Sequence, residues 1–232
     1  MMPNPLPHAA SAIDATLFDT VRTRLFTAVI GDVMDAEGLT HQFLPPEIRA
    51  LVPELVIVGR AMPVLEADCH TDVSTKAAPF GLLFEALDDL KPGEIYICTG
   101  GSPRYALWGG LMSTRARSLG CHGAVVDGFH RDTREILALG FPVFSAGSYA
   151  QDQRMRGRVI DYRCPIEFSN RCRVEPGDLV VGDVDGVVII PRAREQEIVA
   201  RALEKVAAEE SVRDSILSGR SAAELFNLTG IM

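Results

Sequence analysis

The middle of the chain alternates strand-like and helix-like segments, and this alternation narrows the possible folds more than any other feature. Short apolar, β-rich runs are separated by segments with helical spacing and are punctuated by Gly and Pro-Gly. Strands separated by helices in this way form βαβ units with a largely parallel sheet. Strands are predicted at residues 94–100, 123–128 and 141–147, and helices at 79–93, 106–120 and 133–140.

The two ends of the chain differ from this middle part. Residues 12–25 and 27–38 are predicted to be helices, the second with Thr27 as its cap, and residues 55–67 a strand bent near Gly59 and Pro63. Later, Asp185-Gly186 predicts a hairpin within the β-rich residues 171–192, and residues 193–218 read as a long polar helix. No Ser/Gly-rich linker divides the chain. We therefore expect one domain over residues 26–192, between an N-terminal tail and helix (1–25) and a C-terminal helical extension (193–232).

Charge and cysteine content narrow the classes of function. The formal net charge of −8 argues against a nucleic-acid surface, which is normally basic, although a local Arg could still bind a small anion. No apolar run reaches the roughly 18 residues of a membrane span, and the first ten residues have no basic-then-apolar export pattern. Five cysteines form no CxxC pair, which predicts reduced thiols. We expect a cytoplasmic protein with neither nucleic-acid nor membrane partners.

The segment RDTRE, residues 131–135, has two interpretations. As the start of a helix, Asp132 at the N-cap and Glu135 three residues later form a variant capping box, in which the Asp132 carboxylate accepts hydrogen bonds from first-turn amides. As a ligand site, the segment follows a strand ending at Asp127, and ligands bind at the carboxyl ends of strands in α/β sheets. Two carboxylates one turn apart suit Mg²⁺, and Arg131 offers a planar fork for a carboxylate ligand. The two interpretations are compatible.

A glycine pair twenty residues upstream supports the ligand interpretation. Gly109 and Gly110 are expected at or near the start of a helix, where amide groups without intrahelical partners attract anions. Glycine also lets a ligand approach the backbone closely. The alternative is that the pair only allows close packing of the helix on the sheet.

The spacing of Gly110, Arg131, Asp132 and Glu135 resembles the G-x20-R-D-x2-E/D motif of the class II pyruvate aldolases. These 4-hydroxy-4-methyl-2-oxoglutarate and 4-carboxy-4-hydroxy-2-oxoadipate aldolases are relatives of RraA, the regulator of ribonuclease activity. The resemblance extends from about residue 27 to residue 219 and includes GAVVDGFHRD, GFPVFSAG and PGDLVVGDVDGVVIIP. It implies an α/β fold, a swivelling β/β/α domain of the RraA type with a long C-terminal helix. It also implies a homotrimer or homohexamer with sites between subunits.

The resemblance further implies how a ligand is held. Asp132 would ligate Mg²⁺ or Mn²⁺ within a shell made largely of water. Arg131 would bind the carboxylate and 2-oxo group of a pyruvate unit, together with the backbone amides of Leu111 and Met112 that follow Gly110.

Two acidic residues bear on whether the chain is an enzyme. Glu135 favours the catalytic branch, because RraA-type regulators lack an acidic residue at this place. The aldolases also use a glutamate from the C-terminal helix of a neighbouring subunit as a metal ligand, and the nearest match is Glu209, with Glu210 as a rival.

The implied function is that of a divalent-metal-dependent lyase that cleaves a 4-hydroxy-2-oxo acid to pyruvate. Decarboxylation of oxaloacetate passes through the same enolate, so this activity is expected too. The alternative is a non-catalytic regulatory binding protein of the RraA type.

Other polar residues have simpler interpretations. His130 either lines the site beside Arg131 or belongs to the packing around the strand. Trp108 is interpreted as packing and Asp183 as a turn residue, while His70 and Asp72 mark a loop that is either solvated or close to the site.

Overall fold

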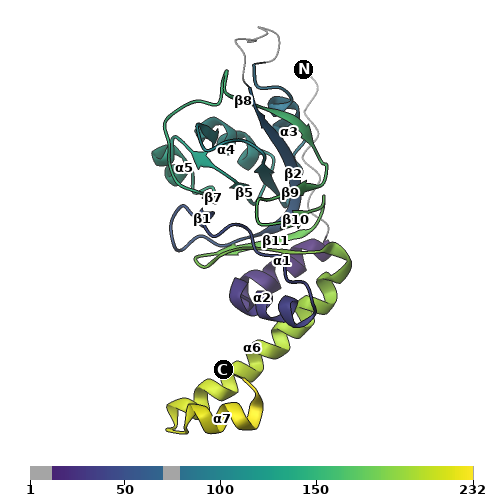
Figure 1. Ribbon diagram of the computed structural model, residues 1–232, viewed down its shortest axis with the longest axis vertical. Helices are drawn as coiled ribbons and strands as arrows, with labels where there is room; N and C mark the ends of the chain where they lie inside the picture. Colours follow the sequence, from purple (N-terminus) through teal and green to yellow (C-terminus); the bar gives the residue numbers. More distant parts are fainter. Residues whose placement is uncertain (1–11, 70–78, 232) are drawn as a thin grey trace.

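The structure is a computed structural model that describes residues 12–69 and 79–231 (Figure 1). His70 and Asp72 lie outside these residues. The described residues contain an eight-stranded sheet with the order β1-β7-β5-β3-β2-β11-β12, in which β8 pairs with β2. Its strands are β1 (Arg49–Ala50), β2 (Ile57–Asp68), β3 (Glu94–Thr99), β5 (Gly123–Val126), β7 (Val143–Ser145), β8 (Gly157–Tyr162), β11 (Leu179–Asp183) and β12 (Gly186–Ile190).

The predicted βαβ units are present in one half of this sheet. Strands β2, β3, β5 and β7 pair in parallel, and short helices connect them. The face covered by these helices buries Tyr96, Trp108 and Phe141, among other apolar side chains. The helices are shorter than predicted, and residues 106–108 form a strand rather than a helical turn. These helices are α3 (Leu83–Asp88), α4 (Gly110–Ser118) and α5 (Thr133–Leu139).

Strand β2 links the parallel half to an antiparallel half. Its first residues pair with β11 and its last residues with β8. The strand continues through Gly59 and Pro63, and its irregularity lies instead between Leu65 and Glu66. The Asp185-Gly186 hairpin is confirmed, since β11 and β12 pair antiparallel up to Asp183 and Gly186.

The sheet curls until its two edges almost meet. The Arg49 guanidinium of β1 donates a hydrogen bond to the carbonyl of Asp185, and the amide of Leu44 donates to the carbonyl of Val187 over 2.9 Å. The interior of this curl is apolar and includes residues from both halves, such as Ile97 and Ile189. A small hairpin, β9 (Ile166–Glu167) with β10 (Arg173–Val174), packs into the same interior. The swivelling β/β/α fold is thus confirmed.

Three helices cover the antiparallel half. These helices pack apolar side chains on β2, β11 and β12, and the long C-terminal helix is confirmed. Beyond this contact α6 projects away from the sheet and carries the final helix at its end (Figure 1). No described helix is long and apolar enough to cross a membrane. The three covering helices are α1 (Ala12–Arg24), α2 (Thr27–Ala36) and α6 (Glu195–Leu217). A 3-10 turn (Arg192–Arg194) precedes α6, and the final helix is α7 (Ala222–Thr229), which the sequence patterns do not predict.

The cap of α2 differs from the prediction. Phe26 occupies the N-cap position, and Thr27 donates from its backbone amide (2.8 Å) and its hydroxyl (2.6 Å) to the carboxylate of Asp183. Asp183 is therefore more than a turn residue, because it satisfies the start of a helix 156 positions away in the chain.

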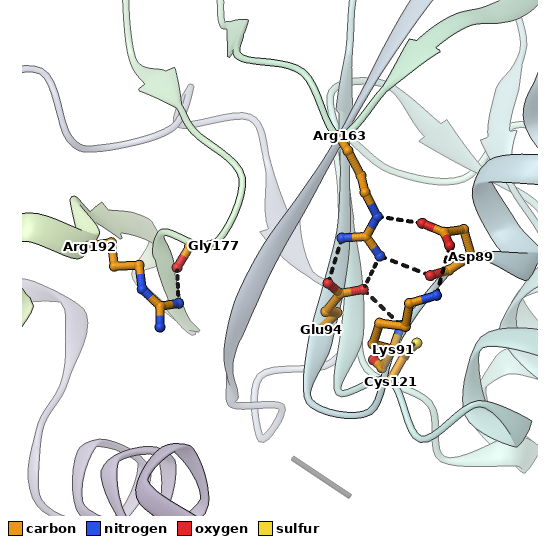
Figure 2. A network of polar contacts seen from close by, with 7 residues as sticks. All are labelled: Asp89, Lys91, Glu94, Cys121, Arg163, Gly177 and Arg192. Carbon is orange, nitrogen blue, oxygen red and sulfur yellow. Dashed lines mark hydrogen bonds and ion pairs between the residues drawn. The ribbon is translucent and has the colours of Figure 1, made fainter. Parts of the chain in front are cut away.

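A second long-range polar contact joins the segment after β8 to the turn between α3 and β3 (Figure 2). Arg163, just after β8, donates two hydrogen bonds to the Glu94 carboxylate, of 2.7 and 2.9 Å, and bonds both the carboxylate and the carbonyl of Asp89. Lys91 lies in the same network, paired with Asp89 at 2.7 Å. The network fixes the turn between α3 and β3.

Candidate active site

Two short strands bring the glycine pair and RDTRE together. β4 (Ala106–Trp108) pairs in parallel with β6 (Phe129–His130), and the amide of Arg131 donates to the carbonyl of Trp108 over 2.9 Å. Each strand is followed directly by one motif and then by a helix, α4 or α5. The pairing therefore places the start of α4 beside Asp132. The twenty residues between Gly110 and Arg131 form most of α4, the connection after it, β5 and β6, which accounts for the spacing of the sequence motif.

Asp132 caps a helix, but not the predicted one. Its backbone is left-handed (φ 61°, ψ 35°), and its side chain makes no capping hydrogen bond to α5. An N-cap that bonds its own helix normally has extended backbone geometry. Instead, Oδ2 of Asp132 accepts a hydrogen bond of 3.0 Å from the amide of Gly110, the first residue of α4. The capping box predicted for residues 132–135 is thus wrong, and the carboxylate bridges the two helix starts.

These residues border a pocket of about 270 Å³. The extended Gly109 precedes α4, whose first amides have no acceptor within the helix and point their positive ends outward. Charged residues such as Arg131 and Asp132 form one part of the pocket wall, and apolar residues such as Phe80 and Phe84 form the other. The pocket is lined by Phe80, Leu83, Phe84, Ala106, Leu107, Trp108, Gly109, Leu111, Met112, Arg131, Asp132, Asp152, Gln153 and Arg154.

The Arg131 guanidinium has donors to spare. Its closest carboxylates are Asp132, 3.9 Å from Nε to Oδ2, and Asp152, 3.5 Å from Nη2 to Oδ1. No hydrogen bond joins this guanidinium to another residue of the described part of the chain. Its side chain is 38% exposed, so it can form a bidentate contact with an incoming carboxylate.

Glu135 lies against the glycine pair rather than among the pocket-lining residues. A Cβ atom on Gly110 would lie 2.4 Å from Oε2 of Glu135, 3.2 Å from Cβ of Asp132 and 3.3 Å from Cβ of Glu135, so the two helix starts are closely packed at this glycine. The negative charge beside the first turn of α4 is favourable for the helix dipole.

A metal at this site would have few ligands from one chain. Asp132 is the predicted ligand, and only its Oδ2 is engaged by a described residue. Within residues 12–69 and 79–231, no group of three or more His, Cys, Asp or Glu side chains could hold a metal. Glu209 lies on α6, where it pairs with Lys205 at 3.4 Å, and it is not part of the pocket of its own chain.

His130 and Trp108 are buried next to the site. Trp108 is buried, donates from Nε1 to the Ser113 hydroxyl over 2.7 Å and stacks on Phe141, as its packing interpretation predicts. His130 is also buried, with Nδ1 2.7 Å from the Ser145 hydroxyl and Nε2 3.0 Å from that of Thr133. Burial lowers the pKa of His130. It lines a neighbouring hollow rather than the pocket that contains Arg131.

Three polar residues of the pocket were not identified from the sequence. Asp152, Gln153 and Arg154 belong to an irregular segment before β8, and the Arg154 guanidinium lies 5.2 Å from the ring centre of Phe80. No spacing pattern marks this segment. The only available signal was its local polarity, which loops share in general.

The fold and the pocket define an α/β domain that presents a helix start, an arginine and a carboxylate to one small cavity. The chain belongs to the RraA-like family, because the family model described as Aldolase/RraA matches residues 27–189. A protein of Halalkalibacterium halodurans provisionally named 4-hydroxy-4-methyl-2-oxoglutarate aldolase is 32% identical over 203 residues, which cover 85% of this chain and 90% of the relative. The resemblance based on the motif is confirmed.

Solved structures agree with this assignment. The crystal structure of an uncharacterized protein from Pseudomonas syringae pv. tomato has a TM-score of 0.78 at 25% identity and covers 96% of both chains. Streptomyces coelicolor RraAS2, described as an unusual member of the RNase ES inhibitor RraA protein family, has a TM-score of 0.74 at 24% identity. That match covers 89% of this chain and 98% of RraAS2, and it shows the shared fold alone.

Proposed function

We propose that this chain is a divalent-metal-dependent lyase that cleaves a 4-hydroxy-2-oxo acid to pyruvate and also decarboxylates oxaloacetate. The observation that carries the proposal is the juxtaposition of the α4 start, Arg131 and Asp132 in one pocket. The name of the Halalkalibacterium relative supports the same class of reaction.

The pocket offers partners for both oxygen-bearing groups of a pyruvate unit, the carboxylate and the 2-oxo group. The guanidinium of Arg131 would bind the carboxylate and the 2-oxo oxygen, and the amides of Leu111 and Met112 would add donors from the helix start. A fixed cation and fixed amide dipoles next to the 2-oxo group would stabilise the negative charge that develops when the C–C bond breaks. These groups act on the enolate more strongly than on the neutral ketone, which is the condition for catalysis.

The chemistry of Asp132 fits Mg²⁺ or Mn²⁺. Such cations bind one or two carboxylates and retain several water ligands, and the Asp132 side chain is 41% exposed at the pocket with Oδ1 not engaged by a described residue. When bound, the cation would supply positive charge that polarises the 2-oxo group. Glu209 of a neighbouring subunit remains the proposed second ligand, in a homotrimer or homohexamer.

The two reactions make different demands on proton transfer. Retro-aldol cleavage requires a base for the proton of the 4-hydroxyl, and a water activated by a carboxylate of the site would serve. Decarboxylation of oxaloacetate releases CO₂ and requires no such base. Oxaloacetate therefore tests the enolate-stabilising groups alone.

The test is pyruvate release from oxaloacetate, 4-hydroxy-4-methyl-2-oxoglutarate and 4-carboxy-4-hydroxy-2-oxoadipate, with Mg²⁺ or Mn²⁺ and with a chelator. We expect turnover of oxaloacetate and of at least one aldol substrate, and loss of both with the chelator. Because metal ions decarboxylate oxaloacetate slowly by themselves, the rate at the same metal concentration without protein is subtracted. No release above that rate would overturn the proposal and favour the regulatory alternative.

A further inference from the structure

A buried carboxyl group, that of Glu66, lies behind the pocket and has no cationic partner among the residues that the structure describes. Glu66 of β2 is 2% exposed, and it forms no ion pair within the described part of the chain. Its Oε2 accepts a hydrogen bond of 2.6 Å from Nε2 of Gln153, while its Oε1 is buried and has no hydrogen-bond partner among the described residues. A carboxylate with one hydrogen bond and no counter-charge is strongly disfavoured in such a place. The geometry therefore favours the uncharged acid.

The described ionisable groups next to Glu66 provide no positive charge to compensate its carboxylate. The neighbouring ionisable groups are Tyr96 and Cys98 of β3 and Tyr105, which comes just before β4. The pKa of Tyr96 and that of Cys98 are raised mainly by burial, and next by the negative charge that Glu66 would carry when ionised. The residue opposite Glu66 on β8 is Val159, which does not ionise. Burial raises the pKa of Glu66 itself to about 8.

Gln153 connects this acid to the pocket. Its side chain is 3% exposed and lines the cavity together with Arg131 and Asp152. Its backbone carbonyl accepts hydrogen bonds from the amides of Arg156 (2.8 Å) and Gly157 (3.0 Å). Gln153 is therefore held through its backbone by the start of β8 and through its amide by Glu66.

We propose that Glu66 is a positioning residue that fixes Gln153 against the pocket and, as an uncharged acid, keeps negative charge away from an anionic 2-oxo acid ligand. This inference rests on the proposed function, since it requires an anion in the pocket. The pocket already contains the carboxylates of Asp132 and Asp152. Loss of the Glu66 proton adds a third negative charge nearby, so affinity for the anion falls at alkaline pH.

The experiment measures binding rather than turnover, with oxalate as a planar mimic of the pyruvate enolate in the presence of Mg²⁺. Titration calorimetry between pH 6.5 and pH 9 compares the wild type with Glu66→Gln, whose amide oxygen can still accept the hydrogen bond from Gln153. Glu54→Gln is the matched control, because Glu54 is exposed in the turn before β2. Infrared spectroscopy of the same proteins reports the carbonyl band of a protonated carboxylic acid.

We expect the wild type and Glu54→Gln to lose about tenfold in oxalate affinity across this range, whereas Glu66→Gln binds equally at both ends. The infrared band should be present at pH 7 in the wild type and absent from Glu66→Gln. The same pH dependence in all three proteins, or no band at pH 7, would overturn the role of Glu66 alone. Absence of oxalate binding at every pH would overturn the proposed function, and the role of Glu66 with it.

Discussion

Two arginines of this chain, Arg60 and Arg131, each lie beside two carboxylates, and their surroundings differ in every other respect. The Arg60 side chain is 9% exposed, and its fork bonds both Asp14 of α1 and Glu195 of α6. Arg131 is 38% exposed, and its carboxylates stand 3.5 and 3.9 Å away without a hydrogen bond. Arg60 thus fastens two helices to the sheet. The guanidinium of Arg131 makes no hydrogen bond to a described residue, so its donors are open to a ligand.

The same contrast distinguishes the two halves of the sheet. The antiparallel half joins its helices through saturated ion pairs and a continuous apolar layer. The parallel half, which contains the pocket, ends in short strands and in helix starts, and only some of the polar groups there have hydrogen-bond partners among the described residues. We therefore expect changes at Arg60 to affect stability and changes at Arg131 to affect ligand binding, because the two guanidinium groups make different contacts.

Asp132→Ala should have the largest effect of the variants considered. It removes the proposed metal ligand and the cap of α4, so metal-dependent pyruvate release should fall about 10³-fold, equivalent to roughly 4 kcal/mol. Loss of the cap should cost about 1 kcal/mol of unfolding free energy. Asp132→Asn, which can still accept the hydrogen bond from Gly110, separates the two roles. Full turnover by either variant would remove Asp132 as the ligand.

Arg60→Met should be the most destabilising of these changes. It removes the guanidinium that pairs with Asp14 and with Glu195, whose side chain is only 15% exposed, and this should lower the free energy of unfolding by about 3 kcal/mol. Turnover per folded molecule should not change. Urea unfolding and activity of the same preparation measure both. A loss of turnover without loss of stability would contradict the separation of the two halves.

Glu66→Gln should change the pH dependence of stability. The pKa of Glu66 is about 8 in the folded state, against an ordinary value of 4.5. Between these values the folded state holds a proton that the unfolded state has lost, so wild-type stability falls as pH rises. Glutamine removes this slope, and the variant should gain about 1.4 kcal/mol per pH unit relative to the wild type. Urea unfolding at pH 5, 6 and 7 tests this, and parallel curves would contradict it.

Arg131→Lys is the counterpart of the change at Arg60. A lysine retains the charge but loses the planar fork, so kcat/KM for oxaloacetate should fall about 10²-fold, or roughly 2.7 kcal/mol. The free energy of unfolding should stay within about 0.5 kcal/mol of the wild type, because the guanidinium has no hydrogen bond to lose to a described residue. Destabilisation as large as that of Arg60→Met would mean that Arg131 is structural.

Sequence patterns predicted the parts of the fold that local periodicity determines. Strands β3, β5 and β7 are continuous apolar runs between glycines, and the Asp185-Gly186 turn has its own local chemistry. The β4 strand was mistaken for helix because Ala106–Trp108 becomes extended only through its pairing with β6, more than twenty residues away. Long-range pairing overrides local preference in such short segments.

The site was predictable to the same extent. The motif identified Arg131, Asp132 and the helix start, which the structure brings into one place. The partner of the Asp132 carboxylate was predicted wrongly, because its left-handed backbone, and hence the direction of its side chain, has no mark in the sequence. Gln153 and Arg154 reach the pocket from a loop without periodicity, and only the tertiary structure identifies them.

Arg154→Gln should have the smallest effect and is the most informative about the substrate. Arg154 shares the pocket with Arg131, so it can meet a second anionic group of a dicarboxylate while Arg131 holds the pyruvate end. Its stacking on Phe80 holds the guanidinium at the apolar wall. KM for 4-hydroxy-4-methyl-2-oxoglutarate should rise about tenfold, or roughly 1.4 kcal/mol, with kcat nearly unchanged, because this contact is made equally in ground and transition states. Affinity for pyruvate, which has no second carboxylate, should not change. If the variant bound both ligands more weakly by the same factor, Arg154 would act through the electrostatic potential of the whole pocket. The proposal that Arg131 binds the pyruvate end and Arg154 the second carboxylate would then be wrong.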